Sequence, residues 1–137
     1  MVDPWEGWTA GAFDALGVAE VGGGWTPYRA AGWIKGAFAL DFRPMLPHVW
    51  DATPNGTPPF VWVLTHLPTQ YGMCAMAAPA ETAVVLADKI AAMTDWSAVT
   101  VESAPFLNGR MQAFMAQHRR IFVCNGNQTI PPWGDVA

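Results

Sequence analysis

A histidine and a cysteine lie eight residues apart in the stretch FVWVLTHLPTQYGMCAMA, which covers residues 60–77. A cysteine nucleophile needs a histidine base within hydrogen-bond reach, so His66 and Cys74 are the first candidates for catalysis. With a three-residue turn they would face each other on two paired strands, whereas an even-numbered turn sends Cys74 to the other face. No neighbouring side chain completes a catalytic site in either register. We therefore expect both residues to be structural, and a small-molecule enzyme that uses them is the alternative.

The other metal-ligating and phosphate-binding residue types show no spacing typical of a cofactor site. Neither CxxC nor HxxxH occurs among the three histidines and two cysteines. The stretch GVAEVGGGW, residues 17–25, lacks the Lys-Ser/Thr of a P-loop and the spacing of a dinucleotide fingerprint. We expect neither a metal nor a cofactor.

Three arginines form a basic segment near the C-terminus. Residues 103–120 contain Arg110, Arg119 and Arg120 and no acidic residue, and a basic helix end can hold phosphate groups. The chain as a whole is acidic, with a pI of about 5.1, whereas nucleic-acid binders present a strongly basic face. Weak nucleic-acid binding at these arginines is an alternative that the composition disfavours.

Aromatic residues give the strongest functional signal. The chain has eight tryptophans, 52% hydrophobic residues and only 13% charged residues, and aromatic anchors among few charges are typical of the centre of an interface. The first 25 residues carry four acids and no base, so they account for the whole net charge of −4. We predict a non-enzymatic protein-binding subunit, either an accessory or structural component of an assembly or a protein inhibitor. Its partner would be another protein or a second copy of the chain. The predicted contact residues are Trp5, Trp8, Phe13, Trp25 and Trp133.

The elements that would position these residues follow from hydrophobic periodicity and from turn residues. We expect an α+β fold, in which two or three helices pack on one face of an antiparallel meander of three to four strands. The predicted strands are residues 37–43, 48–52, 60–67 and 73–77. The predicted helices are a short one over residues 27–35, one that starts at Pro79, and one that starts with Ser103 as N-cap and runs through His118 to Ile121.

Composition also predicts the organisation of the chain. We expect an extended acidic arm rich in glycine and tryptophan at residues 1–25, a single core domain at 26–125 and a proline-containing tail at 126–137. Prolines and glycines interrupt the longest uncharged run, residues 52–80, which argues against a membrane span. The acidic start MVDPWEGW is unlike a secretory signal. A cytoplasmic location is the resulting expectation.

Overall fold

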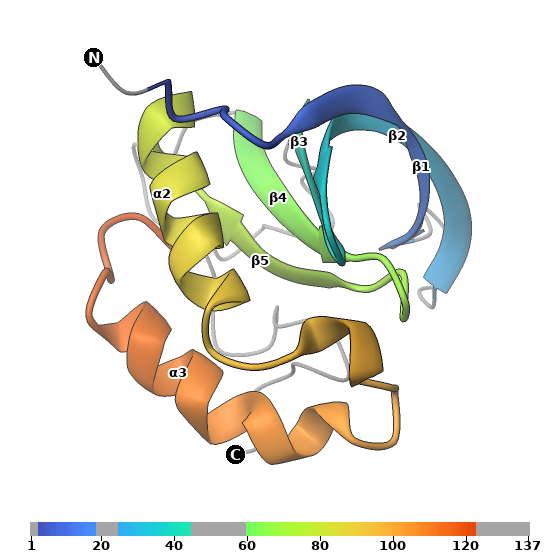
Figure 1. The fold of residues 1–137 in the computed structure, drawn as a ribbon, viewed down its shortest axis with the longest axis vertical. Helices are drawn as coiled ribbons and strands as arrows, with labels where there is room; N and C mark the ends of the chain where they lie inside the picture. The colour runs from blue at the N-terminus through green and yellow to red at the C-terminus, as the bar shows by residue number, and fades with distance from the viewer. Residues whose placement is uncertain (1–2, 19–24, 45–59, 123–137) are drawn as a thin grey trace.

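The computed structural model describes residues 3–18, 25–44 and 60–122. Within them the fold is α+β, with a five-stranded antiparallel sheet in the order β1-β2-β3-β4-β5 and two α-helices (Figure 1). The strands are β1 (Thr9–Val18), β2 (Trp25–Lys35), β3 (Phe38–Pro44), β4 (Phe60–His66) and β5 (Gly72–Met76). The helices are α2 (Ala80–Ala91) and α3 (Asn108–Ala116), with short 3-10 turns η1 (Trp96–Ala98) and η2 (Ala104–Leu107). The predicted strand at 48–52 and the tail at 126–137 lie outside the described residues.

The meander from β3 to β5 and the helix α2 confirm the expectations from periodicity. β4 lies between β3 and β5 and is buried on both faces over most of its length, as its continuous apolar run predicts. Pro79 precedes α2, Glu81 lies in its first turn and Lys89 in its last, which suits the helix dipole. The apolar stripe of α2 is buried against the sheet, with Leu86 and Ile90 at its centre.

The predicted helix over residues 27–35 is wrong, because these residues belong to β2. This strand pairs with β1 from Val18↔Trp25 to Thr9↔Ile34. Thr26 and Pro27 are residue types typical of a helix start. The hydrogen-bonded ladder with β1 decides the structure instead, and it joins residues that are distant in the sequence. Pro27 lies where β2 pairs with β1 and not with β3, so its missing N–H is tolerated as on an edge strand.

The sheet also begins earlier than the sequence predicts. Residues 9–18, which composition assigns to the extended arm, instead form β1 and pair with β2. Phe13 and Ala15 alternate with exposed residues and are buried. Residues 3–8 precede the sheet as a short segment of turns. Whether residues 1–25, 26–125 and 126–137 behave as separate units stays a prediction.

Gly32 is the point at which β2 leaves β3. The ladder between these strands has only three pairs, from Trp33↔Leu40 to Lys35↔Phe38. A Cβ at Gly32 would overlap the carbonyl oxygen of Leu40 and lie 3.0 Å from the Cβ of Asp41, so only glycine permits this close approach. Beyond this point β1 and β2 curve away from β3 (Figure 1). The hairpin returns to the sheet through a hydrogen bond from the Leu16 N–H to the Gln70 carbonyl, 2.8 Å long.

The third predicted helix is shorter than its apolar stripe suggests. The chain forms η2 before α3, and α3 ends at Ala116, so His118 lies in the turns that follow. Ser103 lies at the N-cap position, as predicted, but of η2, and its side chain makes no capping hydrogen bond, because its hydroxyl oxygen accepts from the Thr100 N–H instead. The turns after α3 bring Ile121 beside the end of β5, where its carbonyl accepts a hydrogen bond from the N–H of Ala77.

The main core lies between the sheet and the two helices. Leu40, Leu64 and Met76 from the sheet meet Ile90 of α2 and Met111 of α3, all less than 2% exposed. Truncation of such side chains to alanine typically costs 2–5 kcal/mol, the sum of the lost transfer free energy and a term for the cavity left behind. No helix of the described residues is long and apolar enough to cross a membrane.

Candidate functional site: an aromatic stripe

His66 is fully buried, and both of its ring nitrogens have hydrogen-bond partners. Its Nε2 lies 2.7 Å from the Trp96 carbonyl oxygen and its Nδ1 2.8 Å from the Thr69 hydroxyl. A carbonyl only accepts, so Nε2–H donates to Trp96, and Nδ1 accepts from Thr69. Burial lowers the pKa of His66 below its ordinary value of 6.5, and the bond to Trp96 opposes this effect without cancelling it. Both nitrogens of this fully buried ring are engaged, which disfavours a role as a general base.

The pairing of Cys74 matches neither of the two strand registers considered above, the one with a three-residue turn and the one with an even-numbered turn. It pairs with Leu64, while Thr65 pairs with Gly72, so β5 carries an extra residue, a β-bulge, between them. Cys74 is half-buried beside the main core cluster. This position is consistent with its behaviour as a small hydrophobic residue of the sheet.

Two consecutive turns at the N-terminus position Trp5 and Trp8. The Asp3 carboxylate accepts from the Trp5 N–H at 2.9 Å, and the Asp3 carbonyl accepts from the Glu6 N–H. The Trp5 carbonyl then accepts from the Trp8 N–H, and Gly7 has the positive φ of +88° that this second turn requires. The sequence DPWEGW therefore turns both indole rings back onto the chain's own sheet.

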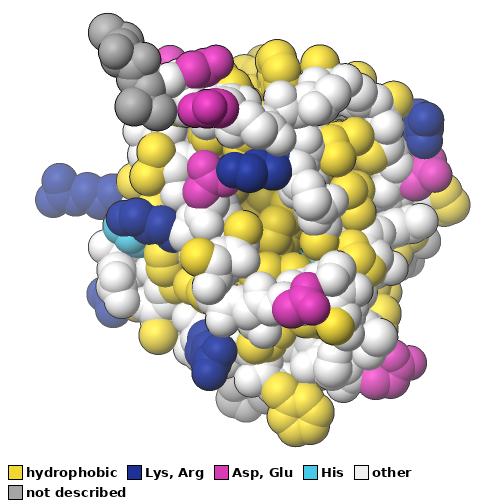
Figure 2. All heavy atoms as spheres, viewed as in Figure 1, with side chains coloured by type: hydrophobic (Ala, Val, Ile, Leu, Met, Phe, Trp, Pro, Cys, Tyr) yellow, Lys and Arg dark blue, Asp and Glu magenta, His cyan; other side chains and the backbone are white. Residues whose placement is uncertain are grey.

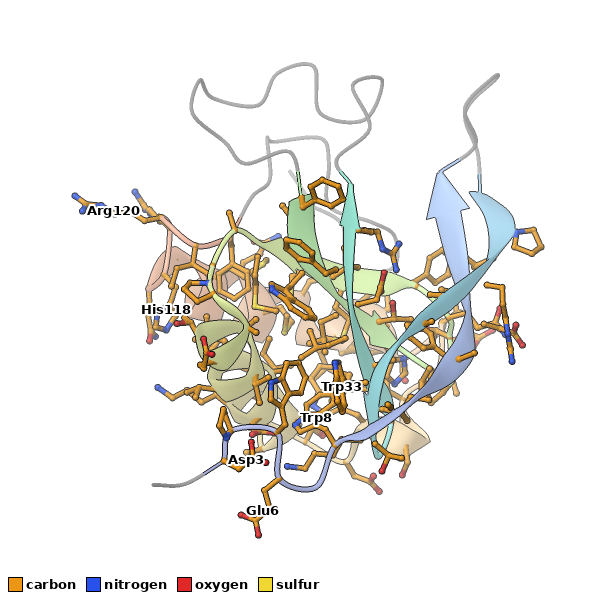
Figure 3. All side chains as sticks on the ribbon, turned by 90° about the horizontal axis from the view of Figure 1, so that it is seen from above. Asp3, Glu6, Trp8, Trp33, His118 and Arg120 are labelled. Carbon is orange, nitrogen blue, oxygen red and sulfur yellow. The ribbon has the colours of Figure 1, made fainter. Side chains whose placement is uncertain are left out.

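The rings form a continuous aromatic stripe, which we define as Phe60, Phe42, Trp62, Trp5, Trp33 and Trp8. The Trp5 ring is its centre, with centroid distances of 4.8 Å to Trp33, 5.7 Å to Trp62 and 6.2 Å to Trp8. These are the distances at which aromatic pairs attract. Figure 3 shows Trp8 and Trp33 between α2 and the sheet, whereas Glu6 points away from the protein. Trp8 is only 8% exposed.

One end of the stripe reaches solvent. Phe42 on β3 lies 5.1 Å from Trp62 and stacks on Phe60 of β4 at 5.4 Å with an interplanar angle of 22°. The exposed fraction is 54% for Phe42 and 44% for Phe60. The stripe is therefore buried at Trp8, partly buried at the other three tryptophans and open at its phenylalanine end.

The structure brings together only some of the predicted contact residues. Trp5 and Trp8 belong to the stripe, while Phe13 lies in a separate cluster with Ala15, Ala30 and Ala39. The Trp25 side chain and Trp133 lie outside the description. The sequence reasoning missed Phe42 and Phe60. The alternation in residues 37–43 and 60–67 could have indicated them, since each phenylalanine lies near the end of its strand on the same face as the core residues of that strand.

Six of the seven basic residues fall into two groups, and Lys89 on α2 belongs to neither. Arg29, Lys35 and Arg43 each pair with an aspartate, at 2.8, 3.0 and 2.6 Å. The nucleic-acid candidates lie elsewhere, and all three are exposed: Arg110 on α3, Arg119 and Arg120 in the turns after it. In Figure 3 Arg120 points away from the protein, with His118 near it. Nucleic-acid binding at these residues stays untested by this geometry.

Within residues 3–18, 25–44 and 60–122, no three His, Cys, Asp or Glu side chains are grouped as a metal site requires. No protein-family model matches the chain, and comparisons with curated proteins and with solved structures find no match to it. The aromatic stripe is therefore the feature from which a function can be argued.

Proposed function

We propose that the protein is a non-enzymatic protein-binding subunit, and that its partner packs on the exposed end of the aromatic stripe. The observation that carries this proposal is the stacked pair Phe42 and Phe60, each about half exposed. The partner is another protein or a second copy of this chain. The sequence predicts the partner contact at Trp5 and Trp8, whereas this proposal places it at Phe42 and Phe60, the exposed end of the stripe to which both tryptophans belong.

The exposed pair is suited to act as an anchor. A phenylalanine offers about 200 Å², so the two exposed halves together provide about 200 Å² of apolar surface, and burial of that area releases about 5 kcal/mol before costs. The Trp62 ring lies against Phe42 and Trp5, so the stripe is already ordered before a partner arrives. Such pre-organisation lowers the entropy lost on binding.

The packing of Trp5 and Trp8 on their own domain supports this assignment. Their rings contact each other and Trp33 or Trp62, so removal of either would affect folding as well as binding. The exposed phenylalanines offer a cleaner test, because substitution at exposed positions usually changes stability by less than about 0.5 kcal/mol.

The test uses Phe42→Ser and Phe60→Ser, with Phe106→Ser as the matched control. Phe106 is 88% exposed on η2, so the control removes the same side chain from a site outside the stripe. The mass of the purified protein is measured by sedimentation, and the mass of the complex is measured after mild purification from its native extract. We expect the wild type and Phe106→Ser to form a complex of fixed stoichiometry, and each stripe variant to weaken it at least tenfold.

A complex that survives the double variant of Phe42 and Phe60 would contradict the proposal. Equal loss with Phe106→Ser would also contradict it, since general surface hydrophobicity would then explain the association. Melting temperatures of all variants exclude unfolding as the cause of a lost complex.

A further inference from the structure

A hollow of about 690 Å³ opens between the β2–β3 turn, the C-terminal end of α2 and η1. Its volume lies in the range of small-molecule sites. Figure 2 shows hydrophobic side chains recessed between charged ones on this face of the protein. The aromatic residues of the wall are Trp8, Phe38 and Trp96, and its charged residues are Lys35, Asp88 and Asp95.

The electrostatics of the wall favour a cation. Two carboxylates face one ammonium group, so the charged side chains sum to −1. Ala91 and Ala92, at the end of α2, also line the hollow, and the carbonyl end of a helix carries partial negative charge. The Asp95 carboxylate accepts hydrogen bonds from the N–H and the hydroxyl of Ser97, at 3.2 and 2.6 Å, which fixes its position.

Lys35 shows which kind of cation this environment stabilises. Its ammonium nitrogen lies 3.0 Å from Asp88 Oδ1 and 5.9 Å from the centre of the Trp8 ring. The face of an indole ring attracts an ammonium group within about 6 Å of its centre, and a neighbouring carboxylate adds Coulomb attraction. The pair is accessible, with about 40% of each side chain exposed, so an external cation can compete with Lys35. The rim is also open at Gly36, where an added Cβ would meet no atom within 4 Å.

We propose that this hollow binds a small organic cation, an alkylammonium ion. The ligand's ammonium group takes the position of the Lys35 nitrogen between Asp88 and Trp8, with Asp95 as a second carboxylate. Its alkyl part lies against Ala37, Ala91 and Ala92. Lys35 then moves toward solvent. This site lies at the Trp8 end of the stripe, and neither Phe42 nor Phe60, the anchors of the partner surface proposed above, lines it.

The probe is n-butylammonium chloride, and 1-butanol and sodium chloride serve as the neutral and ionic controls. Binding is followed by the NMR shifts of the indole N–H groups, with the Trp8 signal assigned from Trp8→Phe. We expect a saturable shift of the Trp8 signal with a Kd of about 1–100 mM, the range of a ligand with a single anchor group. Neither control should produce it.

Paired variants separate this site from general charge effects. Lys35→Met should tighten binding about threefold, because it removes the competing ammonium, and Asp95→Asn should weaken it about threefold. Lys89→Met and Glu81→Gln change the net charge equally at exposed positions of α2 outside the hollow, so they should leave Kd unchanged.

Three outcomes would overturn the proposal. The first is the absence of a saturable Trp8 shift, and the second is an equal shift with 1-butanol, which would indicate apolar contact only. The third is a Lys35→Met variant that binds no more tightly than Lys89→Met, because the competition between Lys35 and the ligand is then absent.

Discussion

Replacement of Gly32 by alanine should destabilise the protein through a single backbone contact. The added Cβ would overlap the Leu40 carbonyl oxygen, closer than Cβ atoms approach in real structures, and would lie 3.0 Å from both Leu40 C and Asp41 Cβ. The obstacle is backbone and not a flexible side-chain end. Relief therefore requires β2 and β3 to separate at the place where their three-pair ladder begins.

The size of the effect follows from two opposing terms. Forced insertion of one carbon into a closely packed site costs about 1–3 kcal/mol, and a backbone clash belongs at the upper end. Alanine recovers about 0.5–1 kcal/mol, because it reduces the entropy of the unfolded chain. We expect a net loss of about 2 kcal/mol in the free energy of unfolding, which lowers Tm by about 7 °C for a chain of this length.

Gly11→Ala is the matched control, because Gly11 lies directly opposite Gly32 in the β1–β2 ladder. A Cβ at Gly11 would meet only the Ile34 Cδ1, at 3.4 Å, an ordinary contact. This variant should be neutral or more stable by up to about 1 kcal/mol. Urea unfolding and thermal melting measure both variants. A Gly32→Ala protein as stable as Gly11→Ala would refute the argument that this contact sets the bend of β2.

Two further predictions concern buried polar groups. The pKa of His66 is lower in the folded state than in the unfolded state, so the unfolded state binds more protons below pH 6.5. The free energy of unfolding should therefore decrease as the pH is lowered through this range, by up to about 1.4 kcal/mol per pH unit. Urea unfolding at pH 7.5 and 5.5 measures this difference in the free energy of unfolding. The difference should disappear in His66→Gln and persist in His118→Gln. Asp41 binds Arg43 through two hydrogen bonds of 2.6 and 2.8 Å, with only 4% and 19% of the side chains exposed. Asp41→Leu should therefore cost about 3 kcal/mol, and addition of Arg43→Met should restore more than half of it, as measured by urea unfolding.

Each of these predictions has an outcome that contradicts it. A pH dependence that persists in His66→Gln would assign it to another group. A double variant of Asp41 and Arg43 that is no more stable than Asp41→Leu would show that the loss comes from packing and not from the broken ion pair between Asp41 and Arg43.

The elements that could be predicted are those whose pattern is local. The apolar stripe of α2 and the alternation around Leu40 each report a buried face within a few residues, so α2 and the β3–β5 meander were predictable. The strands β1 and β2 were not. Their residues are stabilised by each other across the ladder from Thr9 to Ile34, and Gly32 fits a close approach to β3 that becomes visible only when the strands are paired.

The candidate site was predictable in composition but not in geometry. The turn residues of DPWEGW are local signals, yet the contact between Trp5 and Trp62 joins positions far apart in the chain. The β-bulge that places Cys74 opposite Leu64 is equally invisible, because one extra residue shifts the register without any change in composition. Aromatic content thus indicated a contact surface, whereas the choice of Phe42 and Phe60 needed the fold.

The short ladder between β2 and β3 has a consequence for local opening. Ten residue pairs hold β1 to β2 and seven hold β3 to β4, but only three ladder pairs and the backbone hydrogen bond from Leu16 to Gln70 join the two groups. Regions with few connecting contacts open as cooperative units at a lower free energy than global unfolding. The β1–β2 hairpin can therefore detach as one piece while β3, β4 and β5 stay paired, and its amide protons should exchange with solvent together and earlier than those of β4.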